Sequence, residues 1–485
     1  MFVRVLLVIA LWACGAAPAS DSKDSGVGER TATTPAVGQR RAGTHDWTRF
    51  GWDAGRSNAS SDSTGITAAN VGSLRRQQVQ LDGTVDASPI YLHGVRVNGA
   101  DRDVFFVTTT YGKTIAIDAN DGSILWRYTP PNFERWVGSR QITTATPVAD
   151  PSRNFIYAAS PDGRIQKLSV ADGRSVWSTA ITLLPEREKI ASSLNYFRGR
   201  IIATTGGYIG DAPPYQGHVA IVDAESGRLS HVWNSLCSDR HELIQPSSCD
   251  ESGSAIWGRT GAVIDTANGD IYIATGNARY DGRVHWGDAA VSIDSTGTNI
   301  LDNYTPTNTD DLNSRDADLG STSPVLLGTG FVLQGGKDGR IRLLQWGRAR
   351  STARRGGETQ IVSTPSGDDL FTAPAVTRGT TTWIFAADNG GTAAWTFAGG
   401  RLQDRWHNRN AGTSPVVAGG LLYVYDHRGG GLRVYDPESG RQIVALDAGN
   451  GHWNTPVIAD GRIALPEGDA NSHRTTGILN IWRLP

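Results

Sequence analysis

The segment IAIDANDGSILW, from Ile115 to Trp126, shows the unit from which most of this chain is built. It reads as a short strand, a turn rich in Asp and Asn that ends in Gly, and a second strand that ends in Trp. The Asp and Gly suit a tight hairpin turn, because Gly adopts positive φ without steric cost. The same unit recurs at 168–177, 219–233 and 432–444.

A second repeated signal is a small residue followed by Pro, placed just before a strand-like run. The last three of these prolines, at 374, 415 and 456, are each 41 residues apart. A period of 40 to 60 residues with about four strands is typical of a propeller blade. The six pairs are Ser88-Pro89, Thr146-Pro147, Ser323-Pro324, Ala373-Pro374, Ser414-Pro415 and Thr455-Pro456.

These repeats predict an all-β fold, a single β-propeller of about eight four-stranded blades. One blade cannot bury both faces of its sheet, so the blades must stack in a ring. We expect the strand around Asp46 to Trp52 to complete the last blade, and most blade tryptophans to pack between blades. The expected blades lie near 84–130, 140–182, 190–235, 254–306, 320–348, 370–408, 412–449 and 453–485.

The composition excludes two broad classes of protein. The chain of 485 residues carries 46 basic and 48 acidic residues, a formal net charge of −2. Such a balance leaves no electrostatic footprint for nucleic acid, so no nucleic-acid partner is expected. Hydrophobic residues make up 39% of the chain, which is enough for a large core and excludes a disordered acidic chain.

The N-terminus has the features of a targeting segment. Arg4 precedes an apolar run from Val5 to Ala13, which is too short to span a bilayer as a helix. Two outcomes stay open: cleavage after Ala17-Pro18-Ala19, or a bacterial lipobox at Leu11 to Cys14 that makes Cys14 a lipidated anchor. Both predict export to the periplasm or outer cell envelope. The expected segments are a signal peptide at 1–19, a flexible linker at 20–45 and the propeller at 46–485.

Cysteine usage agrees with export. Cys237 and Cys249 lie twelve positions apart, and in an oxidising compartment such a pair is most simply a disulfide. The alternative is two unrelated buried thiols. The sequence contains no C-x-x-C-H haem motif and no Cys/His zinc cluster, so an oxidoreductase of this sequence needs an external electron acceptor.

Three features together resemble the pyrroloquinoline quinone (PQQ) repeat proteins: the D-x-x-x-G-x-x-x-W turn, the opening WTRFGWDAGRS at 47–57 and the small-Pro strand starts. That family includes quinoprotein alcohol dehydrogenases, polyvinyl-alcohol-dehydrogenase-like proteins and non-enzymatic propellers of outer-membrane assembly. The resemblance covers nearly all of the chain from residue 46 onward. The same blades serve catalysts and scaffolds, so the repeat alone does not decide the function.

Three local matches imply a cofactor site of the dehydrogenase type. Trp257, in GSAIWGRTGAVID, resembles the residue that stacks under the quinone ring. Asn277, in IYIATGN, resembles the ligand of a calcium ion beside the cofactor. Lys337, in GGKDGRIRLL, resembles the cation that polarises the quinone carbonyl. The alternative roles are packing between blades for Trp257, a turn for Asn277 and solvent exposure for Lys337.

The sequence also departs from the dehydrogenase pattern. No adjacent cysteine pair exists, and the calcium glutamate of the family is missing, with Asp211 as the nearest carboxylate. The nearest counterpart of the catalytic aspartate is Asp288, in HWGDAAVSID. Asp316 and Asp318 alternate, so both are expected to face one side, where they line the channel, bind a cation or lie at a solvated strand end.

Two functions follow from these residues. The first is a PQQ- and calcium-dependent dehydrogenase that oxidises an alcohol or polyol, with Asp288 as the base. The second is a non-catalytic propeller that binds an envelope protein as a scaffold. A Ser-His-Asp hydrolase is not supported, because no G-x-S-x-G elbow precedes a helix.

Overall fold

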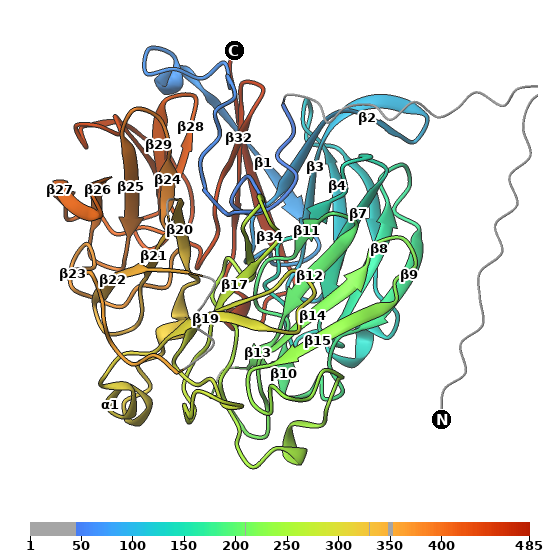
Figure 1. Ribbon diagram of the computed structural model, residues 1–485. Helices are drawn as coiled ribbons and strands as arrows, with labels where there is room; N and C mark the ends of the chain where they lie inside the picture. The colour runs from blue at the N-terminus through green and yellow to red at the C-terminus, as the bar shows by residue number, and fades with distance from the viewer. Residues whose placement is uncertain (1–44, 209, 329, 348–352) are drawn as a thin grey trace, which may run out of the picture. The chain divides into compact units, whose positions relative to one another are not determined.

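Eight four-stranded antiparallel sheets follow one another along the chain and form an eight-bladed β-propeller (Figure 1). The structure is a computed structural model that describes residues 45–208, 210–328, 330–347 and 353–485. The predicted fold class is therefore confirmed. The proposed signal peptide, Cys14 and nearly all of the linker lie outside the described residues.

The first four blades lie between residues 90 and 304. Blade 1 contains β2 (Ile90–Val97), β3 (Ala100–Thr108), β4 (Thr114–Asp118) and β5 (Ile124–Tyr128). Blade 2 contains β6 (Val148–Ala149), β7 (Phe155–Ser160), β8 (Arg164–Ser169) and β9 (Ser175–Ala180). Blade 3 contains β11 (Asn195–Phe197), β12 (Arg200–Thr204), β14 (His218–Asp223) and β15 (Leu229–Asn234). Blade 4 contains β16 (Val263–Ile264), β17 (Ile271–Ala274), β18 (Ala290–Ile293) and β19 (Ile300–Tyr304).

The remaining blades complete the ring. Blade 5 contains β20 (Val325–Gly328), β21 (Phe331–Gln334), β22 (Arg340–Gln345) and β23 (Gln360–Ser363). Blade 6 contains β24 (Ala375–Thr377), β25 (Thr382–Ala387), β26 (Thr392–Ala398) and β27 (Arg401–Asn408). Blade 7 contains β28 (Val416–Ala418), β29 (Leu421–Asp426), β30 (Gly431–Tyr435) and β31 (Gln442–Asp447). Blade 8 contains β32 (Val457–Ala459), β33 (Arg462–Glu467), β34 (Gly477–Arg483) and β1 (Arg75–Leu81).

Other regular elements in the described part of the chain are short. A two-stranded sheet joins β10 (Glu188–Lys189) to β13 (Gly206–Gly207), and the α-helix α1 covers Thr309–Ser314. The 3-10 turns are η1 (Val71–Ser73), η2 (Phe133–Arg135), η3 (Pro246–Ser248), η4 (Leu319–Ser321) and η5 (Ala470–Ser472). No helix among the described residues is long and apolar enough to cross a membrane.

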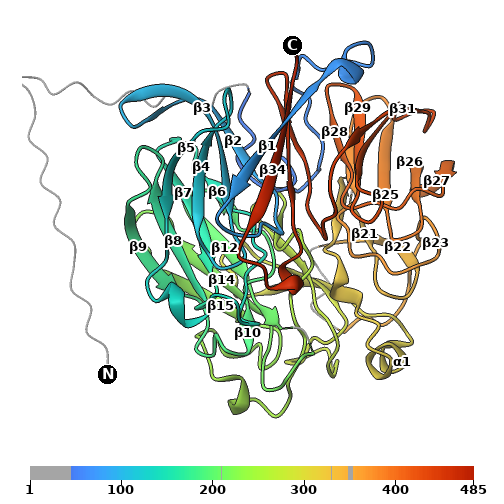
Figure 2. The same ribbon diagram turned by 180° about the vertical axis from the view of Figure 1, so that it is seen from behind.

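The ring is closed by β1, which pairs antiparallel with β34 so that both ends of the propeller share blade 8 (Figure 2). The prediction that Asp46 to Trp52 supplies this strand is wrong. Gly51 and Trp52 both have positive φ, which ends any extended run there. Trp47 instead makes an isolated bridge to Tyr91 in blade 1.

The segment that follows Trp47 ties several blades together along their innermost strands. The guanidinium of the buried Arg56 donates to the carbonyls of Phe50, Ser193 and Leu194. Backbone N–H groups of blades 2, 4, 6 and 7 donate to carbonyls of the segment: Ala149 to Thr48, Ile264 to Ala54, Val376 to Ser57 and Val417 to Asn58.

The blade tryptophans pack between blades, as predicted. The indole of Trp126, in blade 1, covers the turn of blade 2, and its Nε1 donates to the carbonyl of Val170 at 2.9 Å. A Cβ on Gly173 of that turn would lie 2.5 Å from the indole ring, so only Gly fits there. The same contact recurs between Trp177 and Gly227 and between Trp406 and Gly440.

The small-Pro signals mark the entrances of the innermost strands, where hydroxyl groups connect neighbouring blades. The hydroxyl of Ser88 donates to the carbonyl of Thr455 at 3.0 Å, joining blades 1 and 8. The hydroxyl of Thr413 donates to the carbonyl of Asn454 at 2.7 Å, joining blades 7 and 8. These bonds hold the strand entrances in register around the axis, where loop residues can meet.

The predicted disulfide is present in the loop after β15. Cys237 and Cys249 are bonded, with their Cα atoms 6.2 Å apart, within the usual range for a disulfide. The bond closes the loop that precedes Trp257.

Candidate functional site

A cavity of 330 Å³ is lined by residues from six of the eight blades, which places it at the axis of the ring. Its walls come from segments that lead into innermost strands and from loops between second and third strands. The lining residues are Thr144, Lys189, Ala191, Gly207, Tyr208, Asp211, Trp257, Arg259, Asp318, Lys337, Phe371, His452, Trp453 and Asn471. We call this space the axial cavity.

Aromatic rings form a continuous part of its wall. The ring of Phe371 lies 6.0 Å from that of Trp257 and 5.0 Å from that of Trp453, measured between centroids. The imidazole of His452 lies 4.8 Å from the indole of Trp453. Such a wall offers a flat aromatic ligand several rings to stack against.

Lys337 stands on this wall next to Trp257. Its Nζ lies 5.3 Å from the centroid of the indole, 2.5 Å from Oδ2 of Asp318 and 3.3 Å from Oδ2 of Asp316. Burial opposes the charge of the ammonium, but Asp318 and Asp316 outweigh it and hold the pKa of Lys337 above its usual value. The cavity therefore contains a permanent cation against an aromatic face.

Asn277 is joined to the same group. Its backbone N–H donates to Oδ1 of Asp318 at 2.8 Å, and its side-chain amide donates to Oδ1 of Asp316 at 2.8 Å. The amide oxygen of Asn277 is buried and has no hydrogen-bond partner among the described residues. The structure thus brings together Asn277, Lys337 and the Asp316–Asp318 pair, which the sequence presented as separate motifs.

Asp288 lies close to this group but does not line the axial cavity. Its side chain is fully buried, Oδ1 accepts from the backbone N–H of Leu319 at 3.0 Å, and Oδ2 has no described partner. Burial raises the pKa of Asp288 well above its usual value, and the nearby charge of Asp318 adds to the effect. The role of Asp288 as a base stays a prediction. Asp211, at the exposed rim, does line the cavity.

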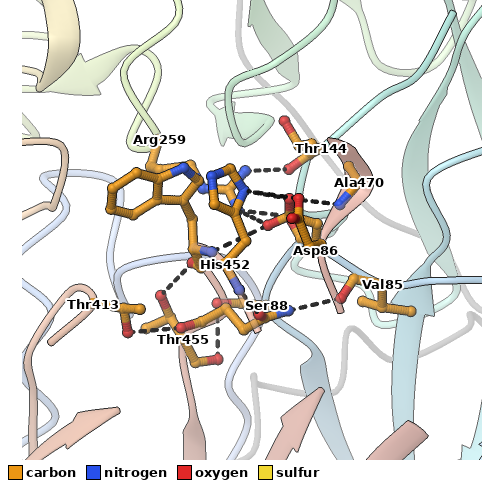
Figure 3. A network of polar contacts seen from close by, with 12 residues as sticks. Val85, Asp86, Ser88, Thr144, Arg259, Thr413, His452, Thr455 and Ala470 are labelled. Carbon is orange, nitrogen blue, oxygen red and sulfur yellow. Dashed lines mark hydrogen bonds and ion pairs between the residues drawn. The ribbon is translucent and has the colours of Figure 1, made fainter. Parts of the chain in front are cut away.

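A second part of the cavity wall is organised around Asp86, a residue that the sequence did not single out (Figure 3). Oδ1 of this buried carboxylate lies 2.6 Å from Nη2 of Arg259, and Oδ2 lies 2.7 Å from Nδ1 of His452. The backbone N–H of Ala470 also donates to Oδ2, at 3.0 Å. Burial disfavours the charge, but His452 and Arg259 outweigh it and hold the pKa of Asp86 below its usual range.

The side chain of Asp469 lies beside this pair. Asp86, His452 and Asp469 are the one group of three potential metal-ligating side chains found in the described part of the chain, with ligand atoms within 4.8 Å of one another. The guanidinium of Arg259 already neutralises Asp86, which argues against a metal ion at this place.

Lys189 adds a second basic side chain to this side. It lies on β10, and no described residue forms an ion pair or hydrogen bond with its Nζ. Burial lowers the pKa of Lys189 to about 8, against the opposing charge of Asp86. Behind it, the buried Glu188 contacts Nε2 of His218 at 3.1 Å, which fixes β10 at the cavity edge.

The sequence does contain a pattern from which Asp86 and His452 could have been predicted to lie at the cavity. Asp86 lies two residues before Ser88-Pro89, and His452 lies three residues before Thr455-Pro456. Polar residues that come just before a small-Pro pair are expected to lie near the axis, because each innermost strand begins at such a pair.

Comparison with known proteins places the chain in a family. The sequence model described as "Outer membrane protein assembly factor BamB", a PQQ-repeat family, matches residues 40–247 and 377–476, more than half of the chain. The protein therefore belongs to this PQQ-repeat family of β-propellers. The unmatched stretch between the two regions contains Trp257, Asn277, Asp288 and Lys337.

Curated relatives include dehydrogenases. The chain is 25% identical over 234 residues to the quinohemoprotein alcohol dehydrogenase ADH IIB of Pseudomonas putida, covering 44% of this chain and 31% of that protein. It is 22% identical over 207 residues to the polyvinylalcohol dehydrogenase of a Sphingopyxis species, covering 40% and 30%. The chain thus spans about a third of the length of these relatives.

Among solved structures, the quinohemoprotein alcohol dehydrogenase ADHIIG of Pseudomonas putida HK5 shares the fold. It superposes with a TM-score of 0.67 at 15% identity, covering 91% of this chain and 80% of that one. At this level of sequence identity, the similarity supports the propeller architecture of this chain and nothing further.

Proposed function

We propose that this protein is an exported PQQ- and calcium-dependent dehydrogenase that oxidises an alcohol or polyol and passes electrons to an external acceptor. The observation that carries the proposal is the axial cavity, where Trp257 and Lys337 meet on one aromatic wall. The quinoprotein relatives support the same assignment. Export to the periplasm or outer envelope, with or without a lipid on Cys14, is part of the proposal.

The residues of the cavity suit the chemistry of PQQ, a flat quinone that carries carboxylates. Trp257, Phe371 and Trp453 offer aromatic faces, and Lys189, Arg259 and Lys337 offer positive charge. When bound, the quinone supplies a two-electron acceptor for the hydrogen of a carbinol carbon. Lys337 would hold a fixed positive charge beside its oxygen, where negative charge develops on reduction.

Two buried oxygen atoms suit a calcium ion. Oδ1 of Asn277 and Oδ2 of Asp288 have no hydrogen-bond partner in the described structure, and carboxylate and amide oxygens are the ligands that calcium prefers. These two residues would hold the ion, while Lys337 stays paired with Asp316 and Asp318.

The test is a titration of purified protein with PQQ and calcium, followed by tryptophan fluorescence. We expect saturable, calcium-dependent quenching that is lost in Trp257→Ala. Dye-linked oxidation of a panel of alcohols then tests turnover, which Trp257→Ala and Lys337→Ala should each lower by orders of magnitude. Absence of binding at micromolar PQQ, or full activity in both variants, would reject the proposal.

Lys113 provides a matched control for Lys337. Its Nζ lies 4.7 Å from the ring centroid of Phe133 and 3.0 Å from Oδ2 of Asp82, and its side chain is 19% exposed against 15% for Lys337. Because Lys113 does not line the axial cavity, Lys113→Ala removes a similar ion pair without touching the proposed site. It should leave binding and turnover unchanged.

The second candidate is a non-catalytic scaffold of the cell envelope. It is favoured by the assembly-factor description of the matching family model. That match omits residues 248–376, so it bears on the blades rather than on the wall that carries Trp257 and Lys337. A stable envelope protein recovered with the purified chain, together with no PQQ binding, would favour the scaffold.

A further inference from the structure

The imidazole of His452 is held by one nitrogen and left open at the other. Nδ1 lies 2.7 Å from Oδ2 of Asp86, and no described residue bonds to Nε2. The backbone N–H of His452 donates to Oδ1 of Asn454 at 2.9 Å, which fixes the start of the side chain. His452 lines the axial cavity with a quarter of its side chain exposed.

The surroundings of Asp86 decide the tautomer of this imidazole. The carboxylate is buried against Arg259 and accepts from the backbone of Ala470, so it stays ionised and can only accept a hydrogen bond from His452. Neutral His452 therefore carries its proton on Nδ1. The lone pair on Nε2 is the part of the ring left for a molecule in the cavity.

We propose that His452, positioned by Asp86, is the proton acceptor for a hydroxyl group bound in the axial cavity. The proposal rests on the proposed dehydrogenase function and deepens it. As the O–H bond breaks, the proton moves to Nε2 and the bonding pair stays on oxygen to form the carbonyl. The carbinol hydrogen leaves with its electron pair to the quinone acceptor, and the imidazolium later returns its proton to water.

The carboxylates near Lys337 are less suited to this task. Asp318 and Asp316 already hold the ammonium of Lys337, at 2.5 and 3.3 Å. Asp288 is buried and does not line the cavity. Asp211 does line it, from the exposed rim, and therefore serves as the comparison variant.

Several charged groups face His452 and shape its pH dependence. Asp86 and Arg259 lie behind it, Asp469 Oδ1 lies 3.7 Å from Nδ1, and Lys189 lines the same cavity. Burial lowers the pKa of the neighbouring His427 to about 4, so that residue stays neutral near pH 7. An acid limb of the pH profile that is lost in His452→Gln would therefore point to His452 rather than to His427.

The first experiment needs neither cofactor nor turnover. The full-length, cofactor-free protein is treated with diethyl pyrocarbonate, which acylates an accessible neutral imidazole nitrogen, and modified histidines are mapped by mass spectrometry. We expect His452 to react, and Asp86→Asn to change its rate severalfold because the amide no longer fixes the Nδ1–H tautomer. If His452 does not react, or if its rate is unchanged in Asp86→Asn, the proposal that Asp86 positions an open His452 is overturned.

The second experiment separates proton transfer from cofactor binding. In PQQ-loaded protein, His452→Gln should lower kcat for alcohol oxidation by about 10²- to 10⁴-fold and remove the acid limb, while the Kd for PQQ stays within a few-fold. Added imidazole should restore part of the rate in His452→Ala. Lys113→Ala, at a residue outside the axial cavity, should keep both the rate and the limb.

The outcomes distinguish this proposal from the proposed function. If wild-type protein binds no PQQ, the dehydrogenase assignment fails, whatever the acylation experiment shows. If PQQ binds and alcohol is oxidised, but His452→Gln keeps the wild-type kcat and Asp211→Asn loses it, the proton acceptor is Asp211 and the proposal for His452 is overturned.

Discussion

The two walls of the axial cavity have opposite charge patterns. On one wall a single cation, Lys337, lies among carboxylates that include Asp316 and Asp318. On the other wall a single buried carboxylate, Asp86, lies among Arg259 and His452. Each central charge is stabilised by neighbours of the opposite sign, so both can stay ionised inside the propeller.

This difference assigns different chemistry to the two walls. A lysine held by carboxylates keeps its proton and can stabilise negative charge on a bound ligand. A histidine held by an ionised carboxylate keeps one nitrogen free to take up a proton. On our proposal, the charge pattern divides the cavity into a side that polarises the bound ligand and a side that accepts a proton.

Among the changes considered, removing the Asp86 carboxylate should have the largest effect on the stability of the fold. Asp86→Ala leaves Arg259 buried without its partner, so we expect a loss of about 3–5 kcal/mol in the free energy of unfolding. Asp316→Ala, on the other wall, removes a carboxylate whose side chain is 70% exposed, and should cost about 0–1 kcal/mol. Urea unfolding followed by circular dichroism measures both. Equal losses would show that the two walls are not stabilised differently.

Removing the central cation should affect turnover more than folding. Lys337→Ala is expected to lower kcat for alcohol oxidation by about 10²- to 10³-fold, because a charge that stabilises the reduced oxygen is lost. Steady-state dye reduction measures the change, with Lys113→Ala as the control. A loss confined to KM would instead indicate a role in binding alone.

The pH dependence of cofactor binding should report Lys189. With a pKa lowered to about 8, its amine is charged below pH 8 and attracts an anionic ligand, and it becomes neutral above pH 8. The Kd for PQQ should therefore rise about tenfold between pH 7 and pH 9. Lys189→Arg should remove this dependence, because Arg keeps its charge over the whole range. The same rise in that variant would locate the titration elsewhere.

The smallest effect should come from exchanging aromatic rings. Trp257→Phe and Trp453→Phe both keep an aromatic face, so each should change the Kd for PQQ by less than about threefold. The quenching amplitude separates them: it should fall more in Trp257→Phe if the quinone stacks beside Lys337. The reverse order would place the ligand on the His452 wall.

Much of the fold was predictable because local chemistry repeats. The Asp-rich turns with a final Gly and the docked tryptophans recur from blade to blade, and each can be recognised from a short stretch of sequence. The closing strand was missed because β1, RRQQVQL, is mostly polar, and its partner β34 lies at the far end of the chain. The segment at 46–52 looked more strand-like, although positive φ at Gly51 and Trp52 bends it.

The candidate site was predictable only in part. Trp257, Asn277 and Lys337 could be selected because each carries a local motif. The structure places Trp257 and Lys337 on one wall and joins Asn277 to the carboxylates that hold Lys337. Asp86, Arg259 and His452 carry no motif of that kind. They form a site only through tertiary contacts, such as the one between Asp86 and His452, which lie 366 positions apart in the sequence.

The sequence by itself determined the repeat, its turns and hence a ring of about eight blades, because these depend on interactions within a blade or with the next one. Only the tertiary structure decided how the ring closes and which side chains meet at its axis. Six blades contribute to the axial cavity, and the ion pairs of Asp86 with Arg259 and His452 join segments of three different blades. Burial and ion pairing at the axis depend on residues that are far apart in the sequence, so no single stretch of sequence reveals them.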